Sequence, residues 1–102
     1  MNVNVKEFTT TPGGRYKQIS SFSGEEFRDD ILRPAIEEAI NKGENIVINL
    51  DGTYGYPTSF LDEAFGKLCK YFTNNELKKI TYISNDEPSL IQDIEKYTKN
   101  NR

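Results

Sequence analysis

The stretch that decides the fold is Ile46–Leu50 (IVINL), a short apolar run rich in β-branched residues. Gly43 precedes it, and the turn pair Asp51-Gly52 follows it. A run of this kind between turn residues is typical of a strand buried within a sheet. Ile80–Ile83 (ITYI) has the same character. With a helix between them, the two strands are expected to be parallel neighbours in the centre of the sheet.

The connecting segment predicts a helix after a loop over residues 53–59 that contains Gly55 and Pro57. Its apolar residues share one face at helical spacing: Leu61, Ala64, Phe65, Leu68, Cys69 and Phe72. Asn74-Asn75 would end this helix. After the second strand, Asp86 is expected to act as an N-cap with Pro88 close to the first helical position. A last helix follows with the stripe Leu90, Ile91, Ile94 and Tyr97.

A further helix is predicted upstream of the first of these strands. Ser23 and Glu26 have the spacing of a capping box, and an apolar stripe begins at Phe27. Pro34 lies inside the stripe, so a kink or break is expected near Arg33. Gly43 is expected to end the helix.

The N-terminal residues predict a hairpin. Val3, Val5 and Phe8 alternate with polar residues, 9–14 (TTTPGG) is a turn segment, and 15–20 would return as an antiparallel strand. The order of elements predicts one α/β domain over residues 1–102. Its expected architecture is a mixed sheet of about four strands with helices mainly on one face.

Composition excludes several functions. The 102 residues include no His, so a Ser-His-Asp triad and an imidazole metal site are ruled out. One Cys cannot form an intrachain disulfide and suits a reducing compartment. The net charge of -3 disfavours nucleic-acid binding. The N-terminus lacks the features of a signal peptide, and no segment is apolar enough for a membrane span. We expect a cytoplasmic protein without a cofactor, a metal or catalytic residues.

Two segments, FSGEEFRDDILRPAI (22–36) and INLDGTYGYPTSFLDEAFGKL (48–68), resemble the STAS-like domain family of unknown function. That family is similar to STAS domains of bacterial anti-sigma factor antagonists. The resemblance implies a non-catalytic regulatory module whose protein partner is a histidine-kinase-like ATPase or anti-sigma factor. It places the antagonists' phosphorylated Ser on Ser59. Pro57 and Phe60 depart from the antagonists' Asp-Ser-Ser-Gly loop.

The candidate site is therefore the segment 52–64. Ser59 or Thr58 is either a helix cap or a phosphorylation and partner-contact residue. The aromatic residues Tyr54, Tyr56 and Phe60 form either a partner surface or part of the core.

Asp62 and Glu63 fall in the first turn of the predicted helix, and they complement its dipole or contribute to the partner surface. The alternative function is a small enzyme or ligand-binding domain that uses Asp62, Glu63 and Tyr56 in a pocket. The segment Gly13-Gly14-Arg15 is interpreted as a plain turn, and Glu25, Glu26 and Arg28 as a solvated helix face.

Overall fold

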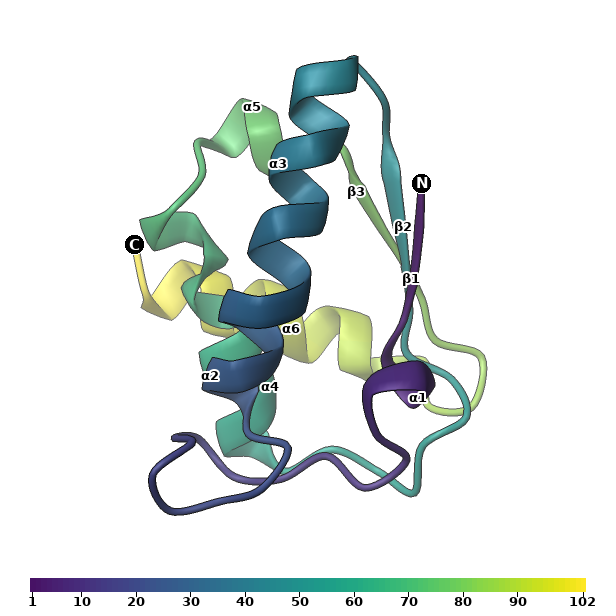
Figure 1. Cartoon of the computed structure of the whole chain (residues 1–102), viewed down its shortest axis with the longest axis vertical. Coiled ribbons are helices and arrows are strands. Elements are labelled where there is room, and N and C mark those ends of the chain that lie inside the picture. The colour runs from purple at the N-terminus through teal and green to yellow at the C-terminus, as the bar shows by residue number, and fades with distance from the viewer.

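The computed structural model describes residues 1–102 and has a sheet of three strands in the order β1-β2-β3. The strands are β1 (Asn2–Asn4), β2 (Ile46–Asn49) and β3 (Ile80–Ile83), and both pairings are parallel. Every helix except α1 lies on one side of this sheet (Figure 1). The expected one-sided α/β architecture is confirmed, but the sheet has three parallel strands and not about four in a mixed arrangement.

The predicted N-terminal hairpin is wrong. After β1, residues Val5–Phe8 form a single helical turn, α1, and β1 pairs in parallel with β2. Residues 15–20 form turns and no strand. Their main-chain groups bond locally, since Ile19 and Ser20 donate to the Tyr16 carbonyl and Glu25 donates to that of Arg15. The segment therefore closes a loop against the start of the next helix.

Strand β2 is central and buried, as its sequence predicts, because Ile46 and Ile48 are wholly inaccessible. Strand β3 is parallel to β2 and beside it, which is also as predicted. Its predicted position in the sheet centre is wrong, since β3 lies at an edge and its residues are partly exposed. The sheet order ends at β3, so no further strand covers its outer edge.

The first long helix runs through three segments, α2 (Gly24–Phe27), the π-helical η1 (Arg28–Leu32) and α3 (Arg33–Lys42). Ser23 caps it by accepting a hydrogen bond from the Glu26 backbone N–H at 3.1 Å. The break expected near Arg33 takes the form of the π-helical turn, in which the Arg33 N–H donates to the Arg28 carbonyl five residues back. Such a turn accommodates Pro34, which has no N–H to donate. Gly43 ends the helix with a positive φ of 65°, as expected.

The second helical region is interrupted. It consists of α4 (Thr58–Ala64), the 3-10 segment η2 (Gly66–Lys70) and a separate short helix α5 (Asn74–Leu77). Asn74 and Asn75 begin a helix here, because Thr73 and Glu76 form a reciprocal capping box that the sequence analysis missed. The last helix, α6 (Ser89–Asn100), carries the predicted apolar stripe with Leu90 and Ile94 buried.

The core lies between the sheet and these helices. Phe27, Phe60 and Phe65 meet at its centre, with ring centroids 5.9 to 6.3 Å apart. Gly66 allows α6 to approach closely, because a Cβ atom there would lie 2.8 Å from the Cβ of Tyr97. No helix in the structure has the length and apolar character needed to cross a bilayer.

Candidate functional site

Two loops meet at the carboxyl end of the sheet, and each braces the other. The Asp51 Oδ1 atom after β2 accepts hydrogen bonds from the backbone N–H groups of Asn85 and Asp86 after β3, at 2.7 and 2.9 Å. In return, Asp86 Oδ2 accepts from the Gly52 N–H at 3.0 Å. Asp86 therefore serves as a loop brace and not as the predicted N-cap of α6.

Tyrosines extend from this braced loop in two ways. The side chain of Tyr54 is 90% exposed, although its backbone N–H donates to the Thr10 carbonyl at 2.8 Å. Tyr56 is half-buried and donates its hydroxyl to the Leu50 carbonyl at 2.7 Å. Burial raises the pKa of this phenol to about 12. Tyr54 is thus an exposed aromatic on an ordered backbone, whereas Tyr56 anchors the loop to the core.

Ser59 and Thr58 lie in the first turn of α4, but neither is its cap. Pro57 occupies the N-cap position, and its carbonyl accepts from the N–H groups of Phe60 and Leu61. The capping interpretation of Ser59 and Thr58 is therefore wrong. Thr58 is exposed and Ser59 is partly exposed. Both hydroxyls lack a hydrogen-bond partner within the protein, which leaves them free for another molecule.

Two residues proposed for the partner surface are buried. Phe60 is 0% exposed and packs between Tyr56 and Phe27, so the core interpretation of this aromatic is the correct one. Glu63 is also buried, at 3% exposure. Their side chains do not contribute to an exposed face.

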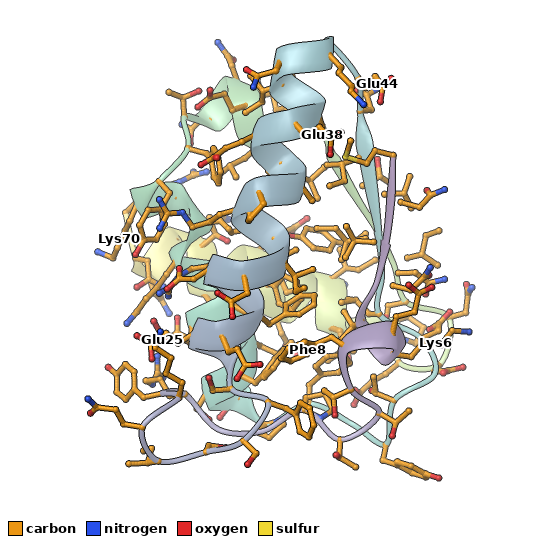
Figure 2. All side chains as sticks on the ribbon, in the orientation of Figure 1. Lys6, Phe8, Glu25, Glu38, Glu44 and Lys70 are labelled. Carbon is orange, nitrogen blue, oxygen red and sulfur yellow. The ribbon has the colours of Figure 1, made fainter.

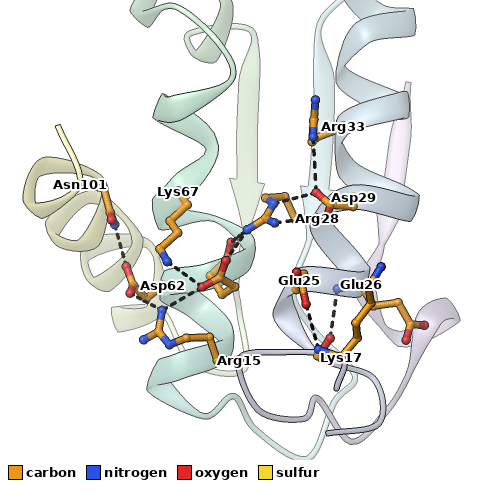
Figure 3. Close-up of polar contacts among 12 residues, drawn as sticks. Arg15, Lys17, Glu25, Glu26, Arg28, Asp29, Arg33, Asp62, Lys67 and Asn101 are labelled. Carbon is orange, nitrogen blue, oxygen red and sulfur yellow. Dashed lines mark hydrogen bonds and ion pairs between the residues drawn. The ribbon is translucent and has the colours of Figure 1, made fainter. Parts of the chain in front are cut away.

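Glu63 is the centre of a network of ion pairs. Figure 3 shows its partners Arg15, Arg28 and Lys67 turned toward one another. Its carboxylate pairs with the guanidinium of Arg28, with Lys67 Nζ at 2.8 Å and with Arg15 Nη1 at 3.1 Å. The side chains of Arg28 and Glu63 are only 6% and 4% exposed. The helices α2 and α4 come close enough for this pairing because of Gly24, where a Cβ would lie 2.8 Å from the Phe60 carbonyl oxygen.

Asp62 extends the network toward the end of the chain. It accepts a hydrogen bond from Arg15 Nη1 and another from Asn101 Nδ2, both at 2.7 Å. Asp62 therefore joins the turn after Gly14 to the C-terminal end of α6. On the other side, Arg28 pairs with Asp29 at 2.9 Å, and the Arg33 guanidinium lies 4.0 Å from the centre of the Tyr71 ring.

The charges in this network set the protonation of both carboxyl groups. Burial raises the pKa of Glu63, but hydrogen bonds from Lys67, Arg28 and Arg15 outweigh it and hold the pKa below its usual value. Burial also raises the pKa of Asp62, and Arg15 and Asn101 reverse that effect in the same way. Both groups are therefore ionised and already paired at neutral pH. Nowhere in the chain do three or more Cys, Asp or Glu side chains gather so as to hold a metal ion.

Several residues of this network were missed by the sequence analysis. Arg28 is buried and not part of a solvated helix face, and Arg15 makes long-range ion pairs in addition to lying in a turn. Gly24, Phe27 and Arg28 follow helical spacing, so the pattern itself placed Arg28 on the buried stripe. No comparable pattern pointed to Asn101.

The parallel sheet and the helices on one of its sides define a small α/β domain, with two loops meeting at the carboxyl end of the sheet. The family model described as a STAS-like domain of unknown function matches residues 23–90, and the chain belongs to this family. No curated protein and no solved structure matches the chain significantly.

Proposed function

We propose that this domain is a non-catalytic regulatory module of the bacterial cytoplasm that binds a protein partner through the loop after β2 and the start of α4. By resemblance to anti-sigma factor antagonists, the partner class is a histidine-kinase-like ATPase or anti-sigma factor. The observation that carries the proposal is the exposed side chain of Tyr54 on a loop that three hydrogen bonds brace. Aromatic side chains held on ordered backbone are favoured at protein interfaces, since little conformational freedom is lost on binding.

Ser59 and Thr58 extend this surface from the loop onto α4. Their free hydroxyls are available either to a partner or to a kinase. Asp62 and Glu63 lie close to Ser59 in the sequence, and free carboxylates there would repel a phosphate. Their repulsion is weakened because Arg15, Arg28 and Lys67 pair with them. Phosphorylation of Ser59 is therefore compatible with the local charge, and partner contact does not depend on it.

The alternative is a small enzyme that uses Asp62 and Glu63, and it has less support. A general acid needs a raised pKa and a general base needs a free carboxylate, whereas both groups here are ionised and held by cations. Tyr56 donates its proton to a main-chain carbonyl and has a raised pKa. These three side chains do not form a reactive set.

The proposal is tested by capture of the native partner with tagged protein. We expect Tyr54→Ala and Ser59→Glu each to reduce retention of the partner at least tenfold, because one removes the exposed aromatic and the other adds charge and bulk. Asn75→Glu is the matched control, since it adds the same charge to the first turn of α5 at the opposite end of the molecule (Figure 1). Circular dichroism melts check that all variants are folded. Wild-type retention by both folded loop variants would exclude this surface.

A further inference from the structure

The outer edge of β3 has unpaired main-chain groups. The carbonyls of Lys79 and Ile83 accept hydrogen bonds from the N–H groups of Ile46 and Leu50 next to it on β2. Since main-chain groups alternate in direction along a strand, those of Ile80 and Tyr82 point away from β2. No strand lies on that side, because β3 is the last of the three. Two residues therefore present their N–H and C=O groups to any strand that approaches.

A groove of about 200 Å³ lies beside this edge, on the side of the sheet that carries the core. Its apolar lining comes from η2, α5, β3 and α6 and from the turn before η2: Phe65, Leu68, Leu77, Ile80, Tyr82 and Ile94. The rings of Phe65 and Tyr82 meet edge to face there, with centroids 5.7 Å apart. An added strand would place alternate side chains over this groove, because side chains alternate between the two faces of a sheet. The core would then continue across the edge.

The charges around the groove favour an acidic occupant. Lys99 and Arg102 line it, and Lys78 lies in the chain between the lining residues Leu77 and Ile80. None of these three cations takes part in an ion pair within the protein; the cations that do are Arg15, Arg28, Arg33, Lys42 and Lys67. Glu95 is the one acidic side chain in the lining. The surplus of positive charge favours a segment that carries carboxylates.

A second copy of this chain fits less well. Antiparallel pairing of two β3 strands about a two-fold axis would bring both grooves, and therefore both sets of Lys99 and Arg102, to the same face. Like charges would then oppose one another across the interface.

We propose that the free edge of β3 and the adjoining groove are a strand-addition site for an extended segment of a partner protein, with alternating apolar residues flanked by carboxylates. Main-chain hydrogen bonds would supply affinity, and the groove and its cations would supply specificity. The surface is separate from the loop around Tyr54, so this inference does not depend on the function proposed above.

The test is an NMR titration of the full-length ¹⁵N-labelled protein with the heptapeptide Ac-DVTVSID-NH2. We expect the amide signals of Ile80 and Tyr82 to shift and their hydrogen exchange to slow. The peptides Ac-KVTVSIK-NH2, of reversed charge, and Ac-DVTPSID-NH2, in which Pro removes a main-chain donor, should bind at least tenfold more weakly.

Variants of the protein make the test specific to the groove. The exposed pair Lys99→Glu and Arg102→Glu should weaken binding of Ac-DVTVSID-NH2 at least tenfold. The exposed pair Lys6→Glu and Lys17→Glu changes the net charge equally away from the groove and should bind like the wild type. Absence of shifts in β3 up to about 2 mM peptide, a limit that corresponds to very weak binding, would overturn the proposal. An equal loss of peptide affinity in the two charge variants would also overturn it. So would β3 amide shifts that change on dilution of the protein alone, because these would show that a second copy occupies the edge.

Discussion

Replacing Glu63 by Gln should destabilise the domain strongly, although it changes only a few atoms. The carboxylate is the shared partner of Arg28, Arg15 and Lys67, and its side chain is 4% exposed. Arg28, itself 6% exposed, would keep Asp29 but lose its most buried partner. Removing one member of a buried ion pair costs about 3–5 kcal/mol, because the remaining charge stays out of water without compensation. We expect about 3 kcal/mol, at the lower end, since the amide oxygen of Gln still accepts one hydrogen bond.

Urea unfolding followed by circular dichroism measures this loss, and the chain offers a matched control. Glu38 pairs with Lys42 four residues on, at 2.9 Å, just as Glu63 pairs with Lys67, but the side chains of Glu38 and Lys42 are more than half exposed. Glu38→Gln should therefore change the free energy of unfolding very little. A loss for Glu63→Gln below about 1 kcal/mol, or equal to that of the control, would show that the ion network is not a stabilising centre of the fold.

Further predictions concern packing and pH. Phe65→Ala should cost about 3–5 kcal/mol in urea melts, as expected for a fully buried Phe, and a loss below about 1 kcal/mol would place Phe65 outside the core. Gly66→Ala should lower the melting temperature because α6 must move away from the added Cβ, and an unchanged melting temperature would refute this close packing. The folded-state pKa of Glu63 lies below its unfolded value, so its contribution is complete above about pH 4.3 and is lost as the pH falls through the folded pKa. The difference in stability between wild type and Glu63→Gln should therefore shrink in acid, and a constant difference down to about pH 2 would contradict the assigned pKa direction.

The elements that the sequence predicts well are those whose signals are local. The strand β2 (Ile46–Asn49) forms as predicted because the β-branched residues 46–48 favour it, and Ser23 and Gly43 bound their helix through the geometry of single residues. The segment 15–20 could not be assigned in this way. Its structure depends on the hydrogen bonds that Arg15 and Lys17 make with Glu25, and on the ion pairs of Arg15 with α4, almost fifty residues away.

The candidate site shows the same division. The exposed loop and Tyr54 lie where the strand-loop-helix order predicts, at the carboxyl end of β2. The burial of Phe60 and Glu63 could not be predicted, because it depends on which side of α4 faces α2. That orientation follows from the close packing of the two helices at Gly24. Asp62 and Glu63 were predicted in the first turn of their helix, but α4 begins at Thr58 and both lie beyond its first turn. A Glu side chain is normally solvated, and Glu63 is buried where three cations pair with its carboxylate.

The most direct test of the proposed function is site-specific photo-crosslinking in the native host, with Tyr54 replaced by the photoreactive residue benzoylphenylalanine. The same replacement of Asn75 on α5, at the far end of the molecule, is the control (Figure 2 shows both ends with their side chains). We expect illumination to join one protein to position 54 and not to position 75. Equal capture at the two positions, or none at position 54 in cells where the partner is present, would contradict a partner surface on the loop after β2.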